Sequence, residues 1–156
     1  MLRLDVSISF LRRLRRDCRG VSAVEFALVA PMLATLLVGV GDYGYGFTCL
    51  IQLRNAVEAG ASYCMHNGAG ACTQSAVAGV VAAATPLAVP AGNVTLTLNY
   101  GCTTGSGITY QSADTPTCSG GVTPGEYAEV SASYDYVTTL GGVTIPLTSQ
   151  TEVRLQ

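Results

Sequence analysis

The sequence contains no lysine and no tryptophan, it has a single histidine, and only 12% of its residues are charged. So few charges, with a mean hydropathy of +0.38, are unusual for a freely soluble globular protein. The histidine, His66, has no serine and aspartate pattern that would make it part of a catalytic triad, and no glycine-rich phosphate-binding motif is present. We therefore expect a protein that is not an enzyme and that binds no cofactor.

The few basic residues are concentrated at one end of the chain. Residues 1–20 hold six arginines against two aspartates, a net charge of +4, whereas residues 21–156 hold two arginines against eight acids, a net charge of −6. The positive-inside rule then predicts a cytoplasmic N-terminus, with the remainder of the chain across the membrane. Because the basic segment adjoins an apolar run and lacks interleaved aromatic residues, we do not expect nucleic acid as a partner.

An apolar run follows the basic segment directly. Residues 21–41 match the roughly 20 residues that cross a bilayer and exceed the apolar core of an ordinary signal peptide. Glu25 lies near the start of this run, and an ionisable group inside a membrane helix marks a candidate functional site. A simple uncleaved signal anchor explains the charge and the length but neither Gly20, just before the run, nor Glu25. Pro31 removes one backbone hydrogen bond and predicts a helix kink.

The pattern after the apolar run predicts an α+β fold. Apolar residues at three- and four-residue spacing extend the first helix beyond the membrane, and alternating residues later in the chain indicate strands of an antiparallel sheet with three or four strands. We expect four regions: a basic leader (1–20), a transmembrane helix (21–41), its continuation as a stalk (42–67) and an exported α+β domain (68–156).

Within the α+β domain, composition and periodicity predict individual elements. They are a second helix over residues 73–84, a strand around 94–98, a long loop over 101–125, a strand over 126–137, and a last strand over 143–155 that is broken or bent at Pro146.

The positions of the six cysteines indicate in which cellular compartment each part of the chain lies. Cys18 lies in the leader, Cys49 lies at the predicted membrane exit, and the remaining four are in the exported part, where oxidation is expected. Four cysteines allow three pairings. We prefer two disulfides that each close a short glycine-containing loop, namely Cys64–Cys72 and Cys102–Cys118. The alternative is a metal site formed by Cys64, His66 and Cys72, whose spacing does not follow a recognised zinc motif.

Glu25 requires a cation if it is buried in lipid. Cleavage after Gly20 would create one, the new α-amine of Val21, and pairing with the amine of a neighbouring subunit would reduce the desolvation penalty of both groups. The alternative is a carboxylate that reaches the cytoplasmic headgroup edge and has no special role.

The residues around this junction resemble a known family. The segment RGVSAVEFAL at 19–28, followed by Pro31, is similar to the start of TadE-like proteins, which are minor pilins or pseudopilins of the Flp (tight adherence) pilus system. LRNAVEAGA at 53–61 resembles the Asn-Ala-Ala-Asp-Ala-Ala stretch of that family, with Glu58 where aspartate is common. YAEVSASY at 127–134 and EVR at 152–154 resemble its last strands.

The resemblance implies a type IV pilin-like protein that a prepilin peptidase cleaves between Gly20 and Val21, with Glu25 as the assembly carboxylate. Its partners would be the inner membrane, other pilin or pseudopilin subunits and the tight-adherence secretion machinery. It would be a single-pass inner-membrane protein with a periplasmic domain, which enters a pilus at the cell surface on assembly. The alternatives are a membrane-anchored adhesin, or a periplasmic binding domain that keeps an uncleaved signal anchor.

Overall fold

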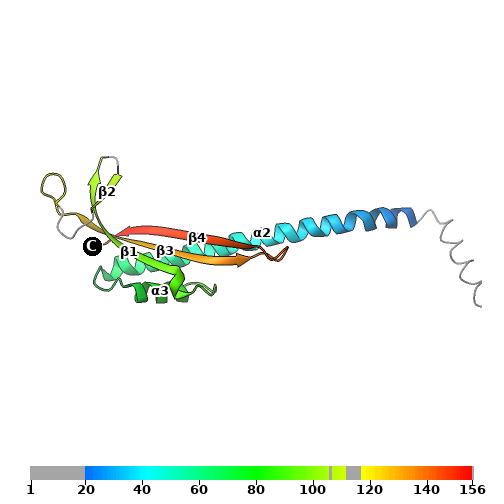
Figure 1. Ribbon diagram of the computed structural model, residues 1–156, viewed down its shortest axis with the longest axis horizontal. Helices are drawn as coiled ribbons and strands as arrows, with labels where there is room; N and C mark the ends of the chain where they lie inside the picture. The colour runs from blue at the N-terminus through cyan, green and yellow to red at the C-terminus, as the bar shows by residue number, and fades with distance from the viewer. Residues whose placement is uncertain (1–19, 106, 112–116, 156) are drawn as a thin grey trace, which may run out of the picture. The chain divides into compact units, whose positions relative to one another are not determined.

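The computed structural model describes residues 20–105, 107–111 and 117–155. The predicted leader, apart from Gly20, and Cys18 within it lie outside these residues. The described chain confirms the predicted α+β class, with elements in the order α2 (Gly20–Asn67), α3 (Gln74–Ala83), the short 3-10 helix η1 (Ala91–Asn93), β1 (Val94–Thr104), β2 (Gly107–Gln111), β3 (Gly125–Val137) and β4 (Thr144–Arg154) (Figure 1). It divides into an N-terminal unit, Met1–Asp42, and a C-terminal unit, Tyr43–Gln156.

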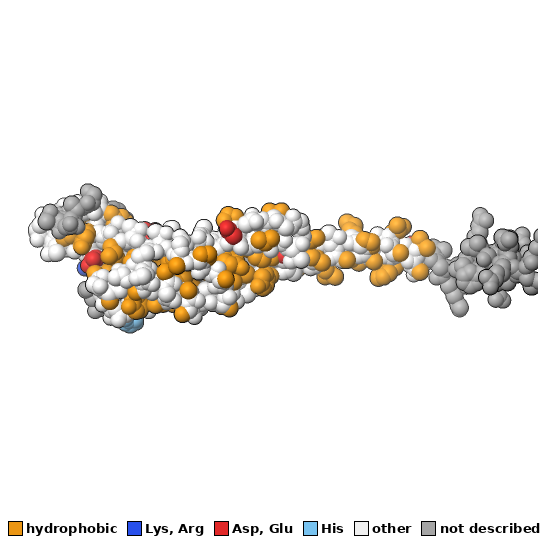
Figure 2. Space-filling model, turned by 60° about the horizontal axis from the view of Figure 1, so that its bottom comes forward, with side chains coloured by type: hydrophobic (Ala, Val, Ile, Leu, Met, Phe, Trp, Pro, Cys, Tyr) orange, Lys and Arg blue, Asp and Glu red, His pale blue; other side chains and the backbone are white. Residues whose placement is uncertain are grey.

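The described part of the N-terminal unit is helix α2 up to Asp42. Its large apolar side chains are exposed all around the helix, including Val24, Phe26, Leu28, Leu33, Leu37 and Val40. On the face of this helix that Figure 2 displays, hydrophobic side chains predominate. The helix is long and apolar enough to cross a membrane, with a mean hydropathy of 2.1 in its most apolar window. An apolar surface of this kind needs lipid or other helices around it.

The C-terminal unit is built on a four-stranded antiparallel sheet. Its strands lie in the order β2-β1-β3-β4. The second half of α2 and helix α3 contribute to one continuous core with the inner face of this sheet. The fully buried members of that core include Leu53, Val57 and Cys64 from α2, Val77 and Val81 from α3, and Val130 from β3. The stalk helix is therefore part of the domain.

The alternation of residues in β3 gives the sheet an inner face as predicted. Ala128, Val130, Ala132 and Tyr136 are buried on the core side. Tyr127, on the opposite face, is also buried, because its ring meets the ring of Tyr110 edge to face at a centroid distance of 6.2 Å. Helix α3 begins where predicted, since the side chain of Thr73 accepts a hydrogen bond from the backbone N–H of Ala76 as an N-cap.

The prediction of a long loop over residues 101–125 is wrong for residues 101–104 and 107–111, which form strands. Strand β1 continues to Thr104, and β2 pairs with it in a register that runs from Tyr100 opposite Gln111 to Thr104 opposite Gly107. The composition, rich in glycine, serine and threonine, suggested a loop. Strand pairing is favoured over a loop here because the hairpin satisfies the backbone hydrogen-bonding groups of both strands. Gly107 allows the hairpin because it adopts a φ of 145°, which other residues rarely reach.

Of the predicted break or bend at Pro146, the break is wrong, and the bend stays a prediction. Strand β4 runs without interruption from Thr144 to Arg154, with Pro146 opposite Asp135. Because β4 is an edge strand, the missing N–H of Pro146 need not cost a ladder hydrogen bond. Proline on an edge also discourages pairing with another chain.

Candidate assembly site on helix α2

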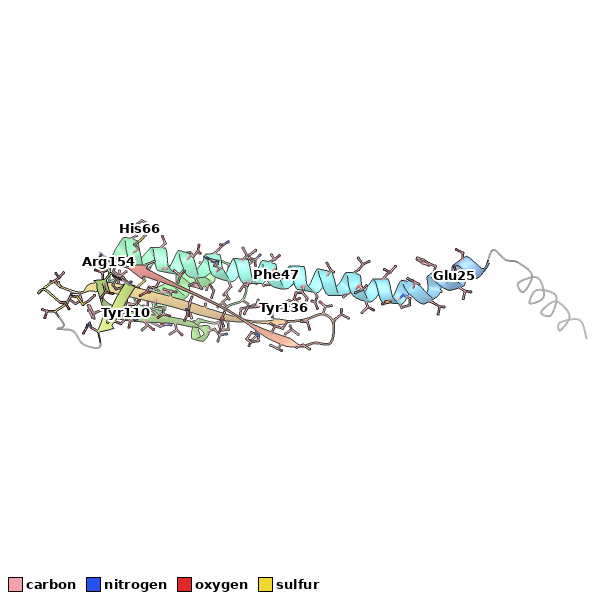
Figure 3. The ribbon with its side chains drawn as sticks, turned by 90° about the horizontal axis from the view of Figure 1, so that it is seen from above. Glu25, Phe47, His66, Tyr110, Tyr136 and Arg154 are labelled. Atoms are coloured by element: carbon pink, nitrogen blue, oxygen red, sulfur yellow. A yellow bond between two sulfur atoms is a disulfide. The ribbon has the colours of Figure 1, made fainter. Side chains whose placement is uncertain are left out.

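The junction between Gly20 and Val21 lies at the first turn of helix α2. Glu25 follows Val21 by four residues, so the two positions lie one turn apart on the same side of the helix. Figure 3 shows Glu25 in this N-terminal stretch of α2. Its side chain is exposed and its large apolar neighbours Val24 and Phe26 are 62% and 68% exposed. The helix thus presents one carboxylate within an exposed apolar surface.

No basic side chain accompanies Glu25 along this stretch of helix. Residues 22–42 contain no lysine, arginine or histidine, and their only acids are Glu25 and Asp42. A carboxylate that enters hydrocarbon without a cation is costly, because its charge loses hydration without compensation. A counter-ion for Glu25 in such a surrounding would have to come from outside residues 22–42.

Pro31 lies inside the helix and leaves the carbonyl of Ala27 without its usual N–H donor. One turn later, the Thr35 hydroxyl donates a hydrogen bond to the Pro31 carbonyl at 2.8 Å. The hydroxyl is thereby satisfied within its own helix, as a membrane interior requires. The kink at Pro31 stays a prediction.

Gly60 marks the tightest approach of α2 to its own domain. A Cβ atom at this position would lie 2.9 Å from Val81 Cγ2, 3.2 Å from Val77 Cγ1 and 3.5 Å from Val130 Cγ1. Helix α3 and strand β3 therefore both rest against the bare backbone of α2 here. In the sequence of residues 50–61, the only indication of this close contact is the glycine itself.

A second close approach occurs nearer the start of the C-terminal unit. A Cβ atom at Gly46 would lie 3.3 Å from Tyr136 Cε1, and the rings of Tyr45 and Tyr136 are 5.8 Å apart. The end of β3 is thus held against the first turns of α2 in this unit. No pattern in the sequence connects Tyr136 with Gly46 and Tyr45.

Both preferred disulfides are present. Cys64 bonds to Cys72 at the end of α2, and Cys102 on β1 bonds to Cys118. The first disulfide takes both thiolates that the alternative metal site with His66 would need, and no group of three His, Cys, Asp or Glu side chains suited to a metal occurs in the described residues. Cys49 is a free thiol, only 1% exposed within the core.

This arrangement predicts the number of thiols that a reagent will find. A chain that has lost its leader should show no reactive thiol when native, because Cys49 is buried, and one when denatured without reductant. A chain that keeps its leader should show a second denatured thiol from Cys18. Titration with a thiol reagent in detergent, before and after denaturation, checks both values. Three or more thiols in the mature chain would contradict the pairing.

A polar contact joins two strands of the sheet that are not neighbours. The Tyr110 hydroxyl on β2 donates a hydrogen bond to a carboxylate oxygen of Glu152 on β4. This hydrogen bond, with the negative charge of Glu152, raises the pKa of Tyr110 to about 12. The contact bridges the two edges of the sheet across β1 and β3.

A shallow polar groove lies on the sheet of the C-terminal unit. It has a volume of about 380 Å³, and its lining consists of small polar side chains and one alanine: Asn93, Thr95, Ser131, Ala132, Ser133, Thr148, Ser149 and Gln150. These residues offer hydroxyl and amide groups but no aromatic ring for a sugar to stack on. The groove gives no specific support to the adhesin alternative.

These features define an α+β protein built on one long apolar helix whose second half is part of the domain core. Residues 20–62 match the family described as TadE-like protein, which confirms the resemblance drawn from the sequence over this segment. The match runs from the start of α2 to just beyond Gly60 and covers 43 of the 156 residues. No curated protein and no solved structure matches the chain.

Proposed function

We propose that this protein is a minor pilin or pseudopilin that serves assembly of a Flp-type pilus, in a structural and non-catalytic role. The observation that supports the proposal most directly is the position of Glu25. This single carboxylate lies one turn after the Gly20–Val21 junction on an exposed apolar helix. It also lies within the segment that matches the TadE-like family. Residues 21–41 act as the membrane anchor before assembly and as the contact helix after it.

Processing supplies the counter-ion that the helix itself lacks. A prepilin peptidase adds water across the peptide bond between Gly20 and Val21, which releases the leader with a carboxylate on Gly20 and leaves an α-amine on Val21. Glu25 on one subunit pairs with this amine on the next. In a low-dielectric surrounding, such a pair offsets the desolvation cost of both charges and sets the register between neighbouring helices.

The charge distribution supports the orientation. The six arginines of the leader favour the cytoplasmic side, and the C-terminal unit follows on the periplasmic side. The oxidised pairs Cys64–Cys72 and Cys102–Cys118 agree with an oxidising compartment. Recognition of the leader by the peptidase and entry into a pilus at the cell surface complete the proposal.

The test is the mass and N-terminal sequence of the protein from its native membrane, with and without the prepilin peptidase. We expect a mature chain that begins at Val21 only when the peptidase is present. A Gly20→Val variant should keep its leader both in cells that contain the peptidase and in cells that lack it. The reason is that the small residue before the cleaved bond is lost. A parent chain that keeps its leader in both cells would overturn the pilin proposal and leave a signal-anchored domain.

A further inference from the structure

One end of the C-terminal unit exposes an unusual number of apolar side chains. On the hairpin between β3 and β4 these are Val137, Leu140, Val143 and Ile145, which are 40–59% exposed. On the adjacent start of α2 in this unit they are Tyr43, Tyr45 and Phe47, which are 61–75% exposed. We call these seven residues the hairpin patch. A concentration of exposed apolar side chains at one end of a small domain marks an interaction site.

The two halves of the hairpin patch, distant in sequence, are held together by direct contact. The ring of Tyr45 lies 5.8 Å from that of Tyr136, and the ring of Tyr136 covers Gly46. Figure 3 shows Tyr136 and Phe47 toward one end of this unit, with Tyr110 and Arg154 toward the other. The hairpin and the start of α2 in this unit therefore lie at the same end of the sheet.

The turn of the hairpin is a closed structure. The backbone N–H of Thr138 donates to the Val143 carbonyl at 2.9 Å, and the Val143 N–H donates to the Thr138 hydroxyl at 2.9 Å. Gly141 and Gly142 adopt φ values of 84° and 62°, which allow the tight reversal. With these backbone groups already bonded, the tip can enter an apolar surrounding at a lower desolvation cost.

Chain connectivity places Tyr43, the first residue of the C-terminal unit, close to the end of the apolar segment. Tyr43 follows Val40, the last large apolar residue of segment 21–41, by three residues. Three residues span at most about 11 Å in any conformation. Tyr43, the first residue of the hairpin patch, therefore lies within reach of the headgroup layer on the side where the apolar segment ends.

We infer that the hairpin patch docks on the membrane surface, with its aliphatic side chains in the boundary between headgroups and acyl chains. This inference rests on the membrane anchoring in the proposed function. Tyrosines at the rim suit that layer because they combine an apolar ring with a hydroxyl. The patch contains no charged residue, and the nearby ionisable side chains along the chain are the acids Asp42 and Asp135. Binding should therefore not depend on anionic lipids.

Docking of this kind would hold the C-terminal unit against the bilayer before assembly. Extraction of the helix into a filament would then release the hairpin patch from lipid, which makes it a surface that other subunits can cover afterwards. The lipid is the occupant that we propose for the anchored state.

The natural absence of tryptophan makes the test direct, because one introduced tryptophan is the only one in the chain. The full chain is placed in vesicles of zwitterionic phosphatidylcholine with or without brominated acyl chains, which quench tryptophan on contact.

Val143→Trp reports on the hairpin patch, and Val137→Trp is a second probe should the first fail to fold. Val122→Trp, at a 62% exposed position before the other end of β3, is the matched control. Leu37→Trp reports on the anchor.

We expect brominated lipid to reduce the fluorescence of Val143→Trp about twofold and to leave that of Val122→Trp nearly unchanged. Adding anionic lipid should not increase the quenching. If Leu37→Trp is quenched and neither hairpin probe is, the inference is wrong while the anchor stands. If Leu37→Trp is not quenched, both the membrane anchoring in the proposed function and the docking of the hairpin patch are wrong. A blue-shifted but unquenched Val143→Trp would assign the hairpin patch to a protein partner and overturn the lipid assignment.

Discussion

Replacing Glu25 with alanine should abolish pilus assembly while leaving leader cleavage and membrane insertion intact. Removing one member of a charge pair within a membrane leaves the other charge uncompensated, at a cost of about 3–5 kcal/mol. If the α-amine of Val21 depends on this pair in each contact between neighbouring helices, incorporation into filaments should fall by roughly a hundredfold or more. Counting pili by electron microscopy, with immunoblots of sheared and membrane fractions, measures the effect.

The matched control is Glu58→Ala, the same substitution further along α2. Glu58 is exposed, and its carboxylate meets the Arg54 guanidinium at 3.2 Å, an i,i+4 surface pair. Such a pair contributes only about 0.3–0.5 kcal/mol, so this variant should fold and insert like the parent. Glu25→Gln separates charge from size and should fail like alanine. Normal piliation in both Glu25 variants would refute the pairing mechanism.

Gly60→Ala should destabilise the C-terminal unit, although alanine is ordinarily the better helix former. The added methyl group would lie 2.9 Å from Val81 Cγ2, so α3 must move or Val81 must change its rotamer. Overpacking of this kind costs about 1–3 kcal/mol. Thermal unfolding of the full chain in detergent, followed by circular dichroism, should show a Tm lower by roughly 5–12 °C.

Gly79→Ala is the control for this prediction. It lies in helix α3, is exposed, and an added Cβ there meets nothing within 4 Å. It should raise stability by about 0.5–1 kcal/mol, because alanine loses less conformational entropy in a helix than glycine. Combining Gly60→Ala with Val81→Ala should cost less than the sum of the two single changes, because the second makes room for the first. A Gly60→Ala protein as stable as Gly79→Ala would contradict the close approach.

The parts predicted correctly from sequence are those where one physical signal dominates locally. Apolar spacing located α2 and its extension as far as Asn67, and alternation located β3 with its buried Val130. The two disulfides followed from short loops that contain glycine. In each case the residues that determine the element are close together in the chain.

The parts that were missed depend on contacts between distant residues. Strand β2 exists because it pairs with β1, and the composition of the surrounding residues 101–125, rich in glycine, serine and threonine, hides this. Pro146 is tolerated because β4 is an edge strand, which only the strand order reveals. The contacts of Gly46 with Tyr136, and of Gly60 with Val81, bring together residues that no local pattern connects. The alternation of Ile108 and Tyr110, and the glycine pair between Val137 and Val143, are the available signals for the two hairpins.

The role of α2 in the core has a consequence for the order of synthesis. Gly60 emerges from the ribosome 70 residues before Val130, its partner on β3. At about 5–20 residues per second, the core face of the helix waits roughly 4–14 s for the strand that covers it. During that interval Leu53 and Val57 have no sheet to bury them. Helix α3, whose Val77 and Val81 also lie against Gly60, can cover part of this face earlier, and the speed of translation sets how long the rest stays open to aggregation.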